Sequence, residues 1–420
     1  MARKVFISVL GTGFYKPCIY GDTGITTRFI QEATLLSIGA KEWSIDDTGI
    51  VLLTSLARTS NWEVADNKRK DPKTNATEDY YGLKLRIEGL QLPFQVQEKD
   101  IPDGKNEDEM WTIFTTLFGA LQDDDELYID LTHAFRYLPM LVLVLTNYAK
   151  FLKGVTVKSI TYGNYEARDG DHAPIVDLLP IVALQDWTHA AAALTRHGDA
   201  GAIKDIVKQQ GLAENEDALN DLVNNLVAVT AEIQTCRGTS ILDATNIKEM
   251  MASLRQLQST MPKPMTPIIE KISESFNQYN TEFDVNNGWL AAQWALQHNL
   301  LQQAATILQE NAVSYFCIRH NIPFNDEYRR DRVNKAAFIA FNHTPKENWR
   351  CNSEKEIQRI EKLLSDEKLT SPLFLNTFNN LTTFRNDLNH FGMRKDPKSW
   401  DEIKGAIEKA YADLIALLTE

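Results

Sequence analysis

The sequence has few cysteines, no long apolar run and no excess of positive charge. Its four cysteines show no paired spacing, which argues against a disulfide framework or a zinc site and fits a reducing compartment. No segment reaches the roughly 18 apolar residues that a membrane span needs, and the first residues lack the layout of a signal peptide. The net charge is −13, so any nucleic-acid binding requires a local basic surface. These absences favour a cytoplasmic protein without a membrane anchor.

The first 185 residues alternate β-rich apolar runs with helical patterns, beginning with a strand at 4–10 and ending with one at 173–180. This alternation predicts βαβ units and a mainly parallel, Rossmann-like α/β sheet. We expect the apolar helix at 137–152 to be buried on all sides. We also expect the polar stretch 61–82 to form an exposed loop.

After about residue 186 every pattern is helical, because apolar residues recur three and four positions apart. The stretch 261–267 holds three prolines in seven residues and is the best candidate for an internal hinge. We therefore predict an α/β domain over 1–185, a helical connector over 186–282 and an all-α domain over 283–420.

The first predicted strand ends in Gly11-Thr12-Gly13, at the position where open α/β sheets bind ligands. The two glycines let the backbone approach a ligand closely, and Thr12 adds a hydroxyl. A dinucleotide fingerprint requires a third glycine where this chain has Lys16, and the second predicted strand ends in serine rather than in an acidic residue. A nicotinamide enzyme is therefore disfavoured.

A second polar loop, with Thr132, His133 and Arg136, follows the fourth predicted strand. We expect Thr132 to cap the next helix, whose free N–H groups attract phosphate. His133 and Arg136 are three residues apart and would share one face of a helical turn. Together these groups predict an anion site. The alternative is an ordinary cap, a packed histidine and an arginine that extends to solvent.

Near the C-terminus the segment "RNDLNH" runs from Arg385 to His390. Histidine carries protons near neutral pH, and arginine stabilises charge on phosphate, so the pair suits RNA cleavage without a metal. Asn386 adds a donor. No carboxylate cluster accompanies the motif, which argues against a two-metal nuclease. The alternative is a surface helix with charged ends, since this spacing also arises by chance.

The stretch "RHNIPFNDEYRRDRVNK" concentrates positive charge within an acidic protein. We predict that Arg329, Arg330 and Arg332 contact RNA through its phosphates. The alternative is a solvated face between a helix and a loop.

These blocks together resemble a known pair of domains. "VFISVLGTGFYKPCIY", "LLTSLARTSNWE", "DLTHAFRYLPML", "ITYGNYEA" and "APIVDLLPIVALQDWTHA" are similar, in this order, to the CARF (CRISPR-associated Rossmann fold) domain of type III CRISPR ancillary proteins. "RNDLNH" matches the R-x4-6-H motif of HEPN ribonucleases. The resemblance covers nearly the whole chain, although its middle shows only generic helices and 61–82 has no clear counterpart.

The resemblance implies a metal-independent endoribonuclease of antiviral defence, activated by a cyclic oligoadenylate and cutting single-stranded RNA. It implies a homodimer or a higher oligomer, no cofactor, and cyclic tetraadenylate as activator, with cyclic hexaadenylate as the second choice. The implied ligand-binding residues are Gly11, Thr12, Gly13, Thr132, His133, Arg136 and Asn164. The implied catalytic residues are Arg385, His390 and Asn386. The alternative is a messenger-binding module whose helical half recruits a partner without catalysis.

Overall fold

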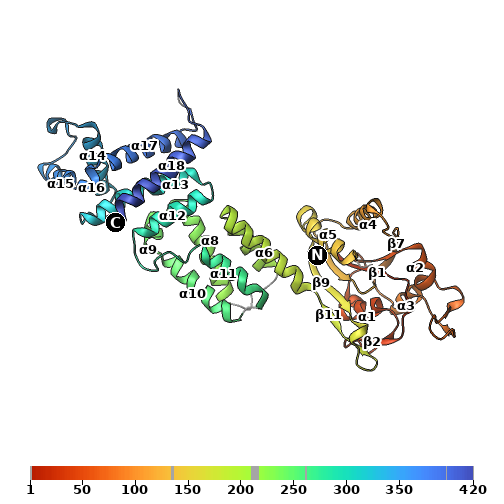
Figure 1. Cartoon of the computed structure of the whole chain (residues 1–420). Coiled ribbons are helices and arrows are strands. Elements are labelled where there is room, and N and C mark those ends of the chain that lie inside the picture. Colours follow the sequence, from red (N-terminus) through yellow and green to blue (C-terminus); the bar gives the residue numbers. More distant parts are fainter. Residues whose placement is uncertain (1, 134–136, 210–216, 261–262, 394, 420) are drawn as a thin grey trace. The chain divides into compact units, whose positions relative to one another are not determined.

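The computed structural model describes residues 2–133, 137–209, 217–260, 263–393 and 395–419. The chain forms two compact units, Met1–Ala183 and Leu184–Glu420, shown in Figure 1. The first unit is built around a β-sheet, and the second is helical.

The sheet of the first unit has six strands. In spatial order they are β11 (Ile175–Asp177), β9 (Thr156–Gly163), β8 (Glu126–Asp130), β1 (Lys4–Leu10), β4 (Thr48–Leu53) and β7 (Gln95–Asp100). All neighbouring pairs are parallel except β11 with β9. The predicted parallel α/β sheet is therefore confirmed. The last predicted strand is shorter than expected, because a helix already begins at Leu179.

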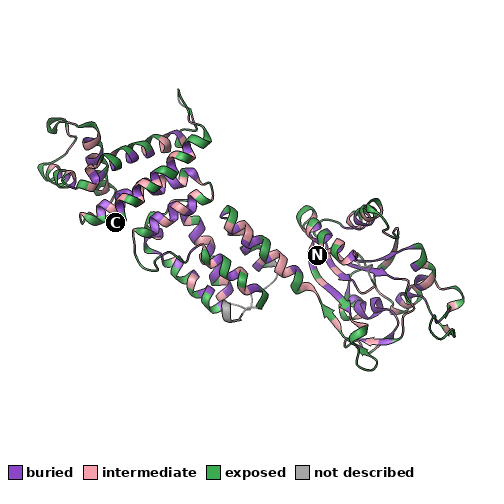
Figure 2. Cartoon of the chain, in the orientation of Figure 1, coloured by how far each residue is buried: buried purple, intermediate pink, exposed green. Residues whose placement is uncertain are grey.

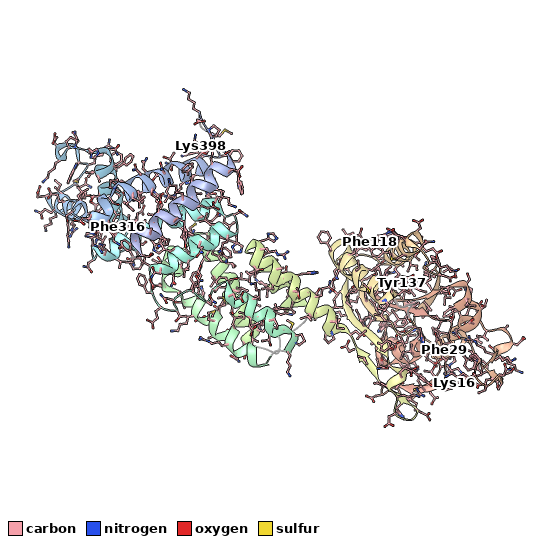
Figure 3. The ribbon with its side chains drawn as sticks, viewed as in Figure 1. Lys16, Phe29, Phe118, Tyr137, Phe316 and Lys398 are labelled. Carbon is pink, nitrogen blue, oxygen red and sulfur yellow. The ribbon has the colours of Figure 1, made fainter. Side chains whose placement is uncertain are left out.

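Strand β1 lies at the centre of the sheet and is apolar on both faces, as expected for a parallel strand covered from two sides. Val5, Ile7 and Val9 belong to one core, and Phe6 and Leu10 to the other. Figure 2 shows the central strands as buried, and Figure 3 labels Phe29, which packs in the second core.

Helices cover both faces of this sheet. The first core includes side chains of α4 (Glu107–Ala120) and α5 (Leu138–Lys153), and the second includes side chains of α1 (Ile30–Ser37) and α3 (Leu83–Leu90). The expectation that the helix at 137–152 is buried all round is wrong. One stripe of α5 is exposed in the single chain, and its members are Met140, Val144, Tyr148, Phe151 and Leu152.

The prediction of an exposed loop over 61–82 is also wrong. A π-helical turn (Arg58–Trp62) leads into a hairpin of β5 (Lys68–Lys70) and β6 (Thr77–Asp79). Four of its side chains are buried, namely Asn61, Trp62, Asp71 and Tyr80. A second small sheet joins β2 (Cys18–Tyr20) to β3 (Thr26–Thr27) and β10 (His172–Ala173).

The second unit contains only helices among its described residues. They are α6 (Leu179–His197, which begins in the first unit), α7 (Gly201–Gln209), α8 (Asp217–Gln234), α9 (Gly238–Asp243), α10 (Thr245–Thr260), α11 (Thr266–Glu274), α12 (Asn286–Gln297), α13 (Leu301–Arg319), α14 (Glu327–Asn342), α15 (Glu354–Leu364), α16 (Glu367–Thr370), α17 (Pro372–Asn389) and α18 (Trp400–Leu418).

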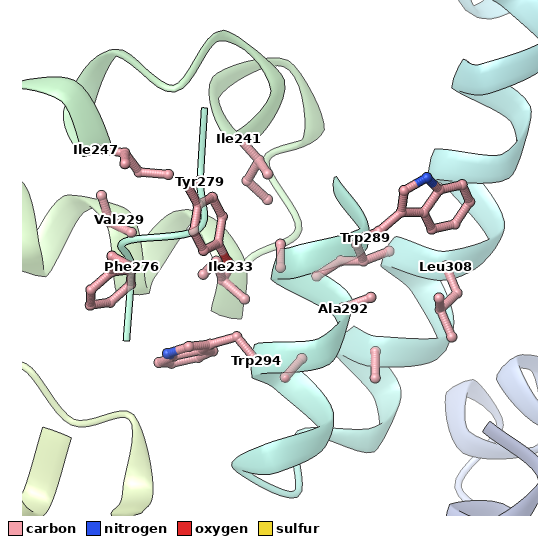
Figure 4. Close-up of a cluster of buried hydrophobic side chains, with 14 of the residues drawn as sticks. Val229, Ile233, Ile241, Ile247, Phe276, Tyr279, Trp289, Ala292, Trp294 and Leu308 are labelled. Carbon is pink, nitrogen blue, oxygen red and sulfur yellow. The ribbon is translucent and has the colours of Figure 1, made fainter. Parts of the chain in front are cut away.

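These helices share one apolar core. Figure 4 shows Ile233 of α8, Tyr279, and Trp289 and Trp294 of α12 as members of one cluster of buried side chains. Residues on both sides of position 282 therefore pack together, and the division into a connector and a C-terminal domain at that point stays a prediction. Within the described residues, no helix is long and apolar enough to cross a membrane.

Candidate functional site

The two polar loops predicted from sequence meet at the carboxyl ends of neighbouring strands. Strand β1 has β4 on one side and β8 on the other, so the strand order changes direction at β1, where α/β sheets bind ligands. The Tyr15 ring stacks on His133, with ring centroids 3.9 Å apart and planes 18° apart. A side chain at Gly11 would collide, because its Cβ would lie 2.5 Å from Tyr15 Oη.

The carbonyl groups of the glycine loop are bound by the segment that sequence analysis could not place. Asn61 Nδ2 donates to the carbonyls of Gly11 and Gly13, at 2.8 and 2.9 Å. Arg69 Nη2 donates to the Thr12 carbonyl at 2.9 Å, and Arg69 Nη1 donates to the Gly13 carbonyl at 2.8 Å. Arg69 also donates to Asn61 Oδ1 at 2.6 Å. We name this pair, Asn61 and Arg69, the loop clasp.

Several positive side chains surround this loop. The guanidinium groups of Arg28 and Arg69 lie 4.9 and 5.3 Å from the Tyr80 ring centroid, within cation–π distance. Lys16, labelled in Figure 3, forms ion pairs with Asp71 at 2.6 Å and Glu78 at 3.0 Å. The hydrogen bond from Lys16 lowers the pKa of the Asp71 carboxyl to about 2. Lys16 is therefore neutralised by its neighbours, whereas Arg69 binds backbone carbonyls.

Thr132 does not cap a helix, so that expectation is wrong. Helix α5 begins only at Leu138, after Tyr137, which makes no side-chain cap. The Thr132 hydroxyl instead donates to Asp130 Oδ1 at 2.5 Å and accepts from the Gly163 N–H at 2.8 Å. It therefore ties the loop after β8 to the end of β9.

Asp130 is a functional candidate that sequence analysis missed. It is fully buried beneath the loop, and Ser8 Oγ donates to its Oδ2 at 2.7 Å. Burial raises the pKa of this carboxyl, while hydrogen bonds from Thr132 and Ser8 oppose the rise. The sequence signal was an acidic residue at the end of an apolar strand, which is costly unless it is bonded.

His133 is neutral rather than cationic. Burial lowers its pKa to about 3, and its Nε2 is buried without a hydrogen-bond partner in the described part of the chain. It can donate or accept a hydrogen bond but does not add positive charge near pH 7. Arg136 lies outside the described residues. Asn164 directly follows β9, and its N–H donates to the Pro174 carbonyl at 2.9 Å.

The C-terminal motif lies at the end of α17. Arg385 is partly buried, and its Nη1 donates to Gln309 Oε1 at 2.9 Å and lies 3.4 Å from Glu310 Oε1. His390 is exposed and follows the last helical residue, after which the chain turns through Phe391 and Gly392 with positive φ.

The asparagines of this motif differ in what they do. The Asn386 carbonyl accepts from the His390 N–H at 3.1 Å, which orders the helix end. Asn389 Oδ1 accepts from Gln302 Nε2 at 2.9 Å, which ties the same end to α13. Asp387 is buried, and its Oδ2 accepts from the Lys398 N–H at 3.3 Å. No group of three His, Cys, Asp or Glu side chains placed to hold a metal occurs within the described residues.

The three arginines predicted to contact RNA do not form one exposed surface. Arg332 is 6% exposed. Arg330 is held inside by Glu310, Ser314 and the Phe324 carbonyl, beside a cavity of about 220 Å³. Arg329 alone is well exposed, and it pairs with Asp326 at 3.1 Å. Of the three, Arg329 alone has the exposure that a contact with RNA requires, and that contact stays a prediction.

Comparisons with known proteins match a family model to most of the α/β unit and a second model to part of the helical unit. Residues 5–166 match the family model "CRISPR system endoribonuclease Csx1, CARF domain", and residues 183–284 match the model "CRISPR-associated protein MJ1674, second domain". The chain is 25% identical over 238 residues to the CRISPR-associated protein MJ1674 of Methanocaldococcus jannaschii. That match covers 54% of this chain and 34% of the relative, so the chain spans about a third of that relative's length.

Among solved structures, Enterococcus italicus Csm6 bound to cyclic hexa-2'-fluoro-hexa-dAMP is similar with a TM-score of 0.44 and 10% identity. The match covers 100% of this chain and 95% of that one. At this TM-score the likeness does not establish a shared fold.

The parallel sheet, the glycine loop at its switch point and the match over residues 5–166 define a CARF-domain protein. Both family models, and the relative MJ1674, are named for CRISPR-associated proteins. The chain therefore contains a CARF domain, followed by a helical segment similar to the second domain of a CRISPR-associated protein.

Proposed function

We propose that this protein is an endoribonuclease that a cyclic oligoadenylate activates. The observation that carries the proposal is an arginine and a histidine, Arg385 and His390, at one helix end of a chain that also has a CARF domain. The matched CARF model is named for an endoribonuclease, which supports the same activity here.

The messenger would bind where the loops after β1, β8 and β9 meet. Gly11, Thr12 and Gly13 would approach it from one side, and the loop from Thr132 to Arg136 from the other. Neutral His133 would contribute a hydrogen bond or a ring contact, and Arg136 would supply the positive charge for phosphate. We propose cyclic tetraadenylate as the activator, with cyclic hexaadenylate as the second choice.

We propose that the protein acts as a homodimer. The exposed stripe of α5 is an apolar surface of the single chain, and contiguous exposed apolar surfaces mark interaction sites. Phe391 and Met393, beside His390, are 87% and 79% exposed, and they offer a second apolar surface. Pairing of two copies would bring two Arg385 and His390 sets into one cleft.

In the proposed reaction a 2′-hydroxyl of single-stranded RNA attacks the adjacent phosphate, and the 5′-oxygen leaves. His390 would carry the protons, and Arg385 would stabilise the charge that develops on the phosphate. Asn386 would orient either of these two side chains. The products would end in a 2′,3′-cyclic phosphate or in the 3′-phosphate formed when it hydrolyses.

The test mixes the full-length protein with fluorogenic single-stranded RNA, with either cyclic tetraadenylate or cyclic hexaadenylate, in excess EDTA. We expect cleavage by the wild type with one of the two messengers, and none by His390→Ala, because the proton carrier is lost. The control is His343→Ala, which removes another exposed histidine of the helical unit.

Cleavage that stops with EDTA, or that continues without His390, would contradict the proposal. Messenger binding without any cleavage by the wild type would favour the alternative, a regulatory module whose helical unit recruits a partner.

A further inference from the structure

Arg385 is held in place by two consecutive residues of α13. Its Nη1 donates to Gln309 Oε1 at 2.9 Å and lies 3.4 Å from Glu310 Oε1. Gln309 is fixed in turn, because its Nε2 donates to Thr382 Oγ1 at 2.9 Å. Within the described part of the chain, Nη1 makes both of these contacts, which leaves Nη2 of Arg385 for a phosphate oxygen.

The second oxygen of Glu310 is bound by another arginine. Arg330 Nη2 donates to Glu310 Oε2 at 2.9 Å and to the Glu310 carbonyl at 3.0 Å. Arg330 Nη1 donates to Ser314 Oγ at 2.9 Å and to the Phe324 carbonyl at 2.8 Å. Four hydrogen bonds therefore fix Arg330 independently of Arg385, and a fixed Arg330 fixes the Glu310 carboxylate.

We propose that Glu310 is a positioning residue of the RNA-cleaving centre, which orients the Arg385 guanidinium through one oxygen while Arg330 anchors the other. This inference rests on the proposed ribonuclease function. The three charges sum to +1, so Arg385 keeps its attraction for a phosphate although it touches a carboxylate. A guanidinium held in advance loses less side-chain entropy when it meets the transition state.

The arrangement assigns Arg330 the role of anchoring Glu310, whereas sequence analysis predicted that Arg330 contacts RNA. An arginine that contacts RNA directly would act independently of Glu310. An arginine that acts through Glu310 would lose its effect once Glu310 is gone. The two roles therefore differ in whether the effects of the two substitutions add.

The experiment measures messenger-activated RNA cleavage by the full-length protein. We expect Glu310→Ala to lower kcat about ten- to a hundredfold, as for loss of a charge-assisted hydrogen bond, and to leave KM within about twofold. Glu310→Gln keeps an oxygen acceptor without the charge, so its kcat should lie between those of Glu310→Ala and the wild type. The matched control is Glu327→Ala, an exposed glutamate of α14 in the same unit, with wild-type kcat expected.

The double variant Glu310→Ala/Arg330→Ala should be no slower than Glu310→Ala alone. If the kcat of the double variant falls below that of Glu310→Ala by the factor that Arg330→Ala alone causes, the inference is overturned in favour of direct RNA contact by Arg330. Wild-type kcat in both Glu310 variants, with Arg385→Ala inactive, would also overturn it. If Glu310→Ala does not fold, the kcat of Glu310→Gln alone tests the inference. An inactive wild type would instead refute the proposed function itself.

Discussion

At the scale of single residues, His133 illustrates how burial changes the chemistry of a side chain. The spacing of His133 and Arg136 predicted that the two side chains share one face and contribute to an anion site. Burial under the Tyr15 ring leaves His133 neutral, with a pKa of about 3, so of this pair His133 offers phosphate no positive charge near pH 7. No sequence pattern contained this information, because the stacking partner comes from the other loop.

This burial predicts a pH dependence of stability. An unfolded histidine protonates near its ordinary pKa of 6.5, whereas folded His133 stays neutral to about 3. The unfolded state binds more protons between these values, so the free energy of unfolding falls as the pH falls, by up to about 2 kcal/mol at roughly pH 5. His133→Phe keeps a ring against Tyr15 and removes the titration.

The measurement is thermal unfolding of the full-length protein at about pH 7.5 and about pH 5. We expect the melting temperature to drop more for the wild type than for His133→Phe. The exposed His172, changed to Phe, should leave the wild-type drop unchanged. Equal drops in the wild type and His133→Phe would show that His133 titrates normally.

At the scale of elements, the strands and most helices followed from the sequence, whereas the residues that shape the sites often did not. Strand β1 was predictable because a buried parallel strand is continuously apolar. The loop clasp was not, because Asn61 and Arg69 are ordinary polar residues whose partners, the glycine-loop carbonyls, lie about fifty positions away in the chain. Glu310 was missed for the same reason.

The loop clasp leads to a prediction for messenger binding. Arg69→Ala removes the donor to the Thr12 carbonyl and one of the two donors to the Gly13 carbonyl, so the loop should lose its fixed shape. We expect the affinity for cyclic tetraadenylate to fall about tenfold, as for loss of charge-assisted hydrogen bonds. Calorimetry measures it. Lys68→Ala makes the same charge change at an exposed neighbouring position and should bind normally. Unchanged affinity in Arg69→Ala would refute a role for the clasp.

At the scale of the whole molecule, the exposed stripe of α5 is the candidate interface of the proposed homodimer. Val144 lies in the middle of the stripe and is 61% exposed. We expect Val144→Glu to convert a dimer into a monomer, because the charge would have to be buried at the interface. Sedimentation velocity measures this change.

The matched control for this prediction is Ile45→Glu, which places the same charge at an exposed isoleucine outside α5. It should sediment as the wild type does. A dimer that persists in Val144→Glu would exclude the α5 stripe as the interface.

The geometry of the loop clasp has one more consequence, at the level of peptide dipoles. In a trans peptide the N–H points opposite to the C=O. Because the carbonyls of Gly11, Thr12 and Gly13 all point toward Asn61 and Arg69, the next three N–H groups point away from the clasp. The Gly13 N–H accordingly meets the Tyr15 hydroxyl, on the side where Tyr15 stacks on the loop after β8. The positive ends of these three dipoles thus point away from the clasp, and this partial charge persists at every pH.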